Sequence, residues 1–409
     1  MIPYGRQDIS QDDIDAVIEV LRSDWLTQGP KVPEFEQAVA NYCGTNHAVA
    51  VNSATSALHI ACLALDLGPG DWLWTSPNTF VASANCARYC GAQVDFVDID
   101  PRTYNMSADA IAAKLAQAEK NGRLPKIAIP VHFAGQPCDM PAIHALSQQY
   151  GFKIIEDASH AIGASYADIP FSSAVNARSS KAAMRQSMKQ IKVGSCTHSD
   201  ITVFSFHPVK IITTGEGGMA VTNNDELATR LRRLRTHGIT SDNTLMQPRP
   251  DDEIWNYQQI ELGFNYRMTD IQAALGLSQL SRLDDYVARR HAIANRYDAK
   301  LAQLAVTTPW QSAQTYSSYH LYPIRINEAK AKKSQRQLYD ALWKSGVAVN
   351  LHYIPVHRQP YYGNLGFKAG DFTEAELFHR EVISLTMYPA LTDSDITTVI
   401  EALAKALIT

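Results

Sequence analysis

A single lysine, Lys210, lies between an aromatic, β-branched run and a glycine cluster in the segment FSFHPVKIITTGEGG (204–218). A cation beside apolar residues destabilises a fold unless it is paired or loses its charge. The segment alone is compatible with a surface lysine in a loop, which is the commoner case, and with a lysine whose amine reacts with a carbonyl group. A desolvating environment favours the second interpretation, because it helps to remove the proton from the amine.

A carboxylate, Asp157, lies at the end of the predicted strand that begins FKII, in the segment EDASHA (156–161). The neighbouring Glu156 would point to the opposite face of an extended strand. A carboxylate at a strand end can hold a pyridinium nitrogen in its protonated state, and a helix N-cap is the equally compatible alternative. His160 could pack against a flat cofactor, although a lone histidine is more often structural.

The stretch NSATSALHIACLAL (52–65) predicts a helix that begins with small hydroxyl residues. Ser53 or Thr55 is suited to cap this helix, and free backbone N–H groups in its first turn could bind a phosphate. Ordinary capping explains the same residues. An anion seat, a carboxylate and a reactive lysine are together the groups that pyridoxal 5′-phosphate requires, and Ser205 and His207 share the strand end that precedes the lysine.

Short β-rich runs alternate with helical stretches over the first half of the chain. This alternation predicts an α/β fold with a mostly parallel, seven-stranded sheet and helices on both faces. Ligands collect beyond the carboxyl ends of such strands, so Asp157 and Lys210 would project from the same rim. The seven predicted strands are HAVAV (47–51), DWLWTS (71–76), QVDFVDID (93–100), KIAIPVHF (126–133), FKIIEDA (152–158), DITVFSF (200–206) and GMAVTN (218–223).

The second half of the chain predicts a smaller C-terminal α/β domain. After a helical stretch over 270–304, the predicted strands are HLYPIRI (320–326), VAVNLHY (347–353) and SLTMYP (384–389). We expect a large domain over residues 1–245 and a small one, with the long linking helix, over 246–409. The segment 170–191 is rich in Ser, Ala and basic residues and is too long for an ordinary connection, so it predicts an inserted surface excursion, with a functional lid as the alternative.

The composition favours an enzyme that acts on small molecules. The net charge is −4, with 37 basic and 41 acidic residues interspersed, which offers no basic face to nucleic acid and no polybasic segment to a membrane. The six cysteines show no metal spacing, and the opening MIPYGRQDIS has neither a charged leader nor an apolar core. We therefore expect a cytoplasmic protein without disulfides, structural zinc or a membrane span. No strand leads into a G-x-G-x-x-G turn, which disfavours a dinucleotide-binding enzyme.

The chain resembles the DegT/StrS-type sugar-nucleotide aminotransferases over nearly its whole length. The segments that carry the resemblance are NSATSAL, SPNTFVASAN, PVHFAGQPCDM, EDASHAIGA, FSFHPVKIITTGEGGMAVTN, LRTHGI and GFNYRMTDIQAALGLSQL. The resemblance implies the fold-type I architecture of pyridoxal-phosphate-dependent transferases. The chain departs from the family in one respect, because Asp157 and Lys210 are 53 positions apart, farther than is usual. The segment 170–191 accounts for the excess, and we expect the catalytic geometry to survive it.

The resemblance also implies roles for individual residues. Lys210 matches the lysine of the internal aldimine, Asp157 matches the partner of the pyridine nitrogen, and Phe80 matches the aromatic residue that stacks on the cofactor. Asn265 matches an asparagine that reaches the phosphate of the neighbouring subunit, which implies a homodimer with shared active sites. The other matched cofactor positions are Thr55, Ser56 and Ser205 for the phosphate and His160 in the pocket. The matched substrate positions are Tyr4, Gln28, His207, His320, His352 and Tyr353.

Within the family, the segments MIPYGRQ, SDWLTQGP, CLALDLGPGDWLWTSPNTF and HYIPVHRQPYY most resemble the branch that serves pseudaminic acid biosynthesis. This implies transfer of an amino group from L-glutamate to C4 of a UDP-linked 4-keto-6-deoxy-N-acetyl-hexosamine. The alternatives are another UDP- or dTDP-keto sugar, aminated at C3 or C4, and a non-catalytic sugar-nucleotide sensor. Related sugar dehydratases carry histidine at the position of Lys210, which disfavours dehydration here.

Overall fold

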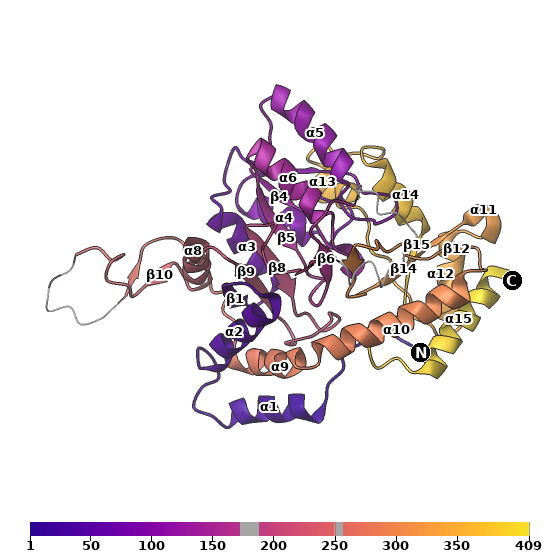
Figure 1. Ribbon diagram of the computed structural model, residues 1–409, viewed down its shortest axis with the longest axis horizontal. Helices are drawn as coiled ribbons and strands as arrows, with labels where there is room; N and C mark the ends of the chain where they lie inside the picture. Colours follow the sequence, from indigo (N-terminus) through magenta and orange to yellow (C-terminus); the bar gives the residue numbers. More distant parts are fainter. Residues whose placement is uncertain (172–187, 249, 251–256, 409) are drawn as a thin grey trace.

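The computed structural model describes residues 1–171, 188–248, 250 and 257–408, and a seven-stranded mixed sheet lies at their centre (Figure 1). The strand order is β1-β9-β8-β5-β4-β2-β3. Strand β9 is antiparallel to both neighbours, and the other neighbours pair in parallel. The predicted mostly parallel sheet is confirmed, with strands β1 (His47–Val51), β2 (Trp72–Thr75), β3 (Gln93–Phe96), β4 (Ile127–Ile129), β5 (Lys153–Asp157), β8 (Ile201–Ser205) and β9 (Gly218–Thr222).

Alternate side chains of these strands enter two different hydrophobic cores. In β5, Ile154 packs in the core under α2, α5, α6 and α9, whereas Ile155 packs in the core under α3, α4 and α8. Both faces are covered, which explains the nearly continuous apolar runs of the strands. The helices are α2 (Lys31–Cys43), α3 (Ala54–Ala64), α4 (Ala82–Tyr89), α5 (Ala108–Lys120), α6 (Met140–Tyr150), α8 (Asp225–Arg235) and α9 (Asp270–Leu280), and α1 (Gln11–Leu21) packs on α9.

The C-terminal part is built on a three-stranded antiparallel sheet, β12-β14-β15. Figure 1 shows α9 and α10 almost in line below the large sheet, with α10 leading towards the yellow helix α15 beside which both termini lie. The strands are β12 (Val306–Thr307), β14 (Tyr322–Ile326) and β15 (Val382–Leu385). The helices are α10 (Leu283–Leu301), α11 (Glu328–Ala331), α12 (Gln335–Lys344), α13 (Pro360–Gly363), α14 (Thr373–Glu381) and α15 (Asp393–Ile408). The division into two domains near residue 245 stays a prediction.

Two expectations for this part are wrong. The segment 347–353 is not a strand but makes isolated bridges, from Val347 to Ile2 and from Asn350 to Ser384, because its polar side chains face a cavity rather than a sheet neighbour. The helical stretch over 270–304 is two helices, which separate at 281–282. Neither glycine nor proline marks this break, so the sequence carried no stop signal there.

The predicted insertion at 170–191 lies mostly outside the described residues, which stop at 171 and resume at 188. On either side, β6 (Ser165–Ala167) and β7 (Gln190–Lys192) pair in antiparallel fashion, and β13 (Thr315–Tyr316) adds a third strand. The sequence did not predict these short strands. The described residues on the two sides of 172–187 are thus brought together by the pairing of β6 with β7. A further short pair, β10 (Ile239–Thr240) with β11 (Gln258–Gln259), forms the arm at the left of Figure 1.

The described residues contain no helix that combines the length and apolarity needed to cross a bilayer. All six cysteines are buried as free thiols, three in each of the two cores of the large sheet.

A buried arginine, Arg290 of α10, ties together segments that meet at the centre of the molecule. It is 1% exposed, and its Nη1 atom donates hydrogen bonds to the carbonyl oxygens of Tyr319 (3.1 Å), His320 (3.2 Å) and Met387 (3.0 Å). The backbone N–H of Met387 in turn donates to the carbonyl oxygen of Tyr4 at 3.0 Å. Burial lowers the pKa of Arg290, and no carboxylate pairs with it among the described residues. The hydrogen bonds to these three carbonyl groups therefore stabilise the buried guanidinium of Arg290.

Replacing Arg290 with methionine should lower the free energy of unfolding by about 2 to 4 kcal/mol, because three buried carbonyl groups lose their donor. Urea unfolding at neutral pH measures the effect. The control is Arg336→Met on α12, where an exposed guanidinium pairs with Asp340 and the unfolding midpoint should hardly change. An Arg290→Met protein as stable as the wild type would contradict the assignment.

Candidate active site

A cavity of about 880 Å³ opens at the carboxyl ends of β5 and β8, beside the first turn of α3. It brings together residues from both ends of the chain. The predicted site residues in its wall are Tyr4, Thr55, Ser56, Phe80, Asp157, His160, Ser205, His207, Lys210, His320, His352 and Tyr353.

Two predicted site residues lie outside this cavity. Gln28 is exposed, with a φ of 56°, in the loop before α2. Asn265 is also exposed and makes an isolated bridge with Thr236, just after α8. Neither residue therefore contributes to the cavity wall of its own chain.

Lys210 presents a partner-free amine to the cavity. Its backbone N–H donates to the carbonyl oxygen of His207 at 2.9 Å, in the turn that follows β8. Its Nζ has no hydrogen bond or ion pair among the described residues. Burial lowers the pKa of Lys210 to about 8, while the negative charge of Asp157 opposes this shift. A fraction of the amine is therefore unprotonated near neutral pH, as a nucleophile must be.

Asp157 is held in place from two sides. Ser83 Oγ donates to its Oδ2 at 2.6 Å, and the backbone N–H of Ser159 donates to its Oδ1 at 3.0 Å. Thr79 Oγ1 shares a further hydrogen bond of 2.8 Å with Ser83 Oγ. The alternative of a helix N-cap is wrong, because a series of turns rather than a helix follows β5. The carboxylate instead closes a turn at the cavity wall.

The first turn of α3 offers free amide groups. Ser53 is the N-cap, whose Oγ accepts from the N–H of Ser56 at 3.1 Å, and Ser56 Oγ donates to Asn52 Oδ1 at 2.7 Å. The N–H groups of Ala54 and Thr55 have no acceptor within the described parts of the chain, and both residues line the cavity. Such groups at a helix N-terminus attract an anion.

Glycine lets the neighbouring strand approach this helix start. A Cβ atom on Gly218 would lie 2.5 Å from the backbone nitrogen of Ala54. One on Gly217 would lie 2.2 Å from Thr214 Oγ1. Gly217 and Gly218, in the glycine cluster that follows the lysine, thus lie where any side chain would clash.

Three histidines, His160, His320 and His352, form an uncharged part of the wall. The rings of His160 and His320 lie 4.4 Å apart between centroids, and His352 Nδ1 makes a hydrogen bond of 2.8 Å with Ser384 Oγ. Burial lowers the pKa of all three, and the charge of Lys210 contributes in each case. For His352 the pKa falls to about 3. The three imidazoles are therefore neutral at neutral pH.

Aromatic rings complete the wall. Phe80 is 59% exposed, and its ring centroid lies 6.4 Å from that of Tyr353. The ring of Tyr4 lies 5.6 Å from that of His352. These rings suit a flat ligand in the cavity.

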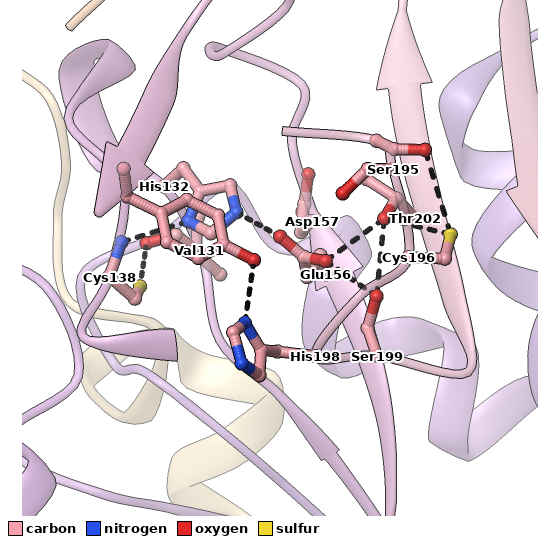
Figure 2. Close-up of polar contacts among 12 residues, drawn as sticks. Val131, His132, Cys138, Glu156, Asp157, Ser195, Cys196, His198, Ser199 and Thr202 are labelled. Carbon is pink, nitrogen blue, oxygen red and sulfur yellow. Dashed lines mark hydrogen bonds and ion pairs between the residues drawn. The ribbon is translucent and has the colours of Figure 1, made fainter. Parts of the chain in front are cut away.

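A second carboxylate, Glu156, lies on the face of β5 opposite to the cavity, as the alternation of the strand predicts (Figure 2). Its Oε2 accepts from His132 Nε2 at 2.7 Å, and its Oε1 accepts from Ser199 Oγ at 2.5 Å and Thr202 Oγ1 at 3.1 Å. The N–H of Cys138 donates to His132 Nδ1 at 3.0 Å, so the proton that His132 donates to Glu156 is on Nε2. Burial alone would raise the pKa of Glu156, but these donors bring it below its usual value.

Sequence reasoning missed several residues of the site, among them Ser83, Asn350 and Glu216. Ser83 bonds to Asp157, and its spacing of four from Thr79 was a signal that both hydroxyls share one side of a helical turn. Asn350 lines the cavity two residues before His352, on the same side of an extended segment. Glu216 also lines it, and no local pattern marked this residue.

Comparison with known families decides the class of this site. The DegT/DnrJ/EryC1/StrS aminotransferase family matches residues 7–404. The chain belongs to this family. It is therefore an aminotransferase that uses pyridoxal 5′-phosphate, and its fold is the type I fold of these enzymes.

Relatives of this aminotransferase act in sugar metabolism. GDP-perosamine synthase of Caulobacter vibrioides is 35% identical over 397 residues, which cover 96% of this chain and 95% of that protein. PseC of Helicobacter pylori, an aminotransferase involved in the biosynthesis of pseudoaminic acid, is 27% identical with a TM-score of 0.84 and 99% coverage of both chains. The pyridoxal-phosphate form of the putative sugar aminotransferase Spr1654 of Streptococcus pneumoniae is 29% identical, with a TM-score of 0.84 over 99% of this chain and 98% of that one.

The Glu156→Gln substitution should destabilise this aminotransferase by about 2 kcal/mol at pH 7, because the amide cannot accept all three hydrogen bonds. The pKa of Glu156 is lower in the folded than in the unfolded protein, so its stabilising effect is present above the unfolded pKa and is lost as the pH falls through the folded pKa. The stability difference between variant and wild type should therefore shrink as the pH falls below the ordinary glutamate value of 4.5.

Urea unfolding across this pH range measures the difference. The matched control is Glu119→Gln on the exposed side of α5, which should show no such pH-dependent difference. A Glu156→Gln effect that stays constant with pH would contradict the ionised state of Glu156.

The rate at which Lys210 of the cofactor-free aminotransferase reacts with added pyridoxal 5′-phosphate should rise as the pH increases through about 8, because the neutral amine is the nucleophile. Borohydride reduction at timed intervals, followed by mass spectrometry of the Lys210 peptide, gives this rate. A midpoint near the ordinary lysine value of 10.5 would show that burial does not lower the pKa of this amine.

Proposed function

We propose that pyridoxal 5′-phosphate binds in this cavity with its phosphate at the first turn of α3, its ring nitrogen at Asp157 and its aldehyde carbon at Lys210. The residues present fit these groups. Free N–H groups of Ala54 and Thr55 suit a phosphate, and a carboxylate fixed by Ser83 suits a protonated ring nitrogen. The main support is that a partner-free, partly unprotonated amine and a hydrogen-bonded carboxylate share one cavity.

The remaining matched residues complete this arrangement. Ser56 and Ser205 add hydroxyl groups on the phosphate side, and Phe80 and His160 add rings beside the cofactor. We assign the substrate side of the cavity to Tyr4, His207, His320, His352 and Tyr353.

We infer that the acceptor is a UDP-linked 4-keto-6-deoxy-N-acetyl-hexosamine, aminated at C4 with L-glutamate as the donor. The similarity to PseC supports a substrate of the pseudaminic acid type, and the sequence segments that resemble this branch agree with it. The similarity to GDP-perosamine synthase supports the coarser class of nucleotide-linked sugars and makes another nucleotide carrier the alternative.

Residues of the chain move the protons of this reaction. When bound, the cofactor supplies an electron sink that makes the proton on Cα of the amino donor acidic. Lys210 Nζ takes this proton as a base and returns it as an acid, and a pKa of about 8 suits both steps near neutral pH. Asp157 keeps the ring nitrogen protonated by charge-assisted hydrogen bonding. His160, His320 and His352 are neutral and therefore do not compete with Lys210 for this proton.

We propose that the enzyme is a homodimer with shared active sites. Gln28 and Asn265 match site positions of the family, yet both are exposed and lie outside the cavity of their own chain. Large apolar side chains near them, Trp25 (57% exposed) and Leu262 (79% exposed), are available for burial by a second copy.

We also propose that each chain consists of a large domain over residues 1–245 and a small domain over 246–409, and that the enzyme is located in the cytoplasm.

The function is tested by incubating the purified enzyme with L-glutamate and UDP-, dTDP- and GDP-linked 3-keto and 4-keto sugars, and by measuring the 2-oxoglutarate released. We expect the highest kcat/KM with the UDP-linked 4-keto sugar. Lys210→Ala should lower turnover by about 10³-fold or more, because both proton transfers lose their base.

The matched control is Lys153→Ala, where a lysine that pairs with Asp200 outside the cavity is removed and turnover should not change. Full turnover of Lys210→Ala would exclude the catalytic assignment. A preference for a GDP- or dTDP-linked sugar would exclude the proposed carrier while leaving the aminotransferase assignment intact.

A further inference from the structure

One hydrogen bond and the neutral state of the ring fix the tautomer of His160. The backbone N–H of Ala134 donates to His160 Nδ1 at 3.3 Å, so this nitrogen carries a lone pair rather than a proton. Burial holds the pKa of His160 well below its usual range, so the ring is neutral. A neutral imidazole carries one proton, which must then lie on Nε2.

This tautomer determines how Tyr353 bonds to the ring. Tyr353 Oη lies 3.2 Å from His160 Nε2, and the two rings are stacked with an interplanar angle of 21°. Because Nε2 already carries the proton, the imidazole donates and the phenol oxygen accepts. The hydroxyl proton of Tyr353 therefore remains unused, and no other described residue accepts it.

The surroundings of Tyr353 keep its phenol protonated and leave the hydroxyl available to donate a hydrogen bond in the cavity. Burial and the nearby Asp157 raise the pKa of Tyr353, so the phenol stays protonated. Tyr353 lines the same cavity as Lys210. Apart from the imidazoles, Lys210 is the one basic side chain among the described residues of the wall. An uncharged donor in such a wall suits a carbonyl oxygen, which gains negative charge as nitrogen adds to its carbon.

We propose that Tyr353 is a catalytic residue whose hydroxyl donates a hydrogen bond to the carbonyl oxygen of the substrate at Lys210, and that His160 is a positioning residue that turns this hydroxyl towards the cavity. The inference rests on the proposed place of the reaction at Lys210. It applies to the keto acid and the keto sugar alike, because the carbonyl group of either would react beside Lys210, with the amino group that the bound cofactor would carry.

The first test is Tyr353→Phe, which removes the hydroxyl and keeps the ring. In the half-reaction with the amino donor alone, followed by the absorbance of the cofactor, we expect the rate at saturating donor to fall by about 10²-fold. Cofactor affinity should stay as in the wild type. The matched control is Tyr166→Phe, at a tyrosine outside the cavity whose Oη lies 3.2 Å from His198 Nδ1, and it should retain the wild-type rate. A Tyr353→Phe rate within about threefold of the wild type would overturn the catalytic role.

The second test concerns His160. Glutamine at this position offers one amide acceptor for Ala134 and one amide donor for Tyr353, whereas leucine offers neither. We expect His160→Gln to keep a higher half-reaction rate than His160→Leu, which should lose about as much as Tyr353→Phe. Equal rates for the glutamine and leucine variants would overturn the positioning role.

A readout without turnover is the ¹⁵N spectrum of the cofactor-free protein labelled at histidine, with the His160 signals assigned by their loss in His160→Gln. We expect an unprotonated Nδ1 and a protonated Nε2. A protonated Nδ1 would overturn the proposal. Because the half-reaction and this spectrum need no sugar, they are decided even if every keto sugar fails, an outcome that would overturn only the proposed acceptor.

Discussion

The parallel pairing of β5 with β8 is the constraint on which the site depends. In this register Glu156 lies opposite Thr202, and Asp157 lies opposite Val203. A slip by one residue would exchange the faces, so that Asp157 would enter the core and Glu156 the cavity. The hydrogen bonds from Thr202 and Ser199 to Glu156 oppose such a slip, because a displaced carboxylate would lose its donors in a buried place.

Glu156 and Lys210 show how hydrogen bonding decides the effect of desolvation on a titratable group. Glu156 is buried with three donors, which favour its ionised form over the desolvation that opposes it. Lys210 has no acceptor for its amine, so desolvation prevails and its proton is held less tightly. The two regions are connected, because the backbone N–H of His132, the partner of Glu156, donates to the carbonyl oxygen of Asp157 at 3.0 Å. Packing on the far face of the sheet thereby contributes to the position of the cavity carboxylate.

The sequence predicted the large sheet because its strands are buried on both faces and appear as apolar runs. It also brought Asp157, Lys210 and the start of α3 together through the rule that ligands collect at carboxyl strand ends. Elements that depend on tertiary contacts were not predictable. The strands β6 and β7 have three residues each and exist through their mutual pairing, so no periodicity marks them. The segment 347–353 has the β-branched and alternating character of a strand, but its neighbours offer it only isolated bridges.

The side chains of the site also fall into two groups: those that the local sequence identifies and those that depend on tertiary contacts. Ser53 was identifiable as a cap from the local sequence, since capping needs only its own helix. The hydrogen bond from Ser83 to Asp157 joins residues of α4 and β5, which no local pattern relates. The tautomer of His160 depends on a backbone N–H in the loop after β4, so it followed only from three-dimensional geometry.

The charge of the cavity follows from the coupling between Lys210 and the histidines. Each positive charge in the cavity makes a second one less favourable, and the charge of Lys210 accordingly helps to lower the pKa of His160, His320 and His352. As the pH falls, Lys210 takes up its proton near pH 8, and the buried imidazoles then resist protonation. Lys210 and these three histidines together thus gain one positive charge over a wide range of pH, and that charge is on the amine which the reaction needs in both protonation states. A wall of neutral imidazoles can donate and accept hydrogen bonds without competing for this proton, whereas lysine or arginine at the same positions would add a permanent charge beside the amine.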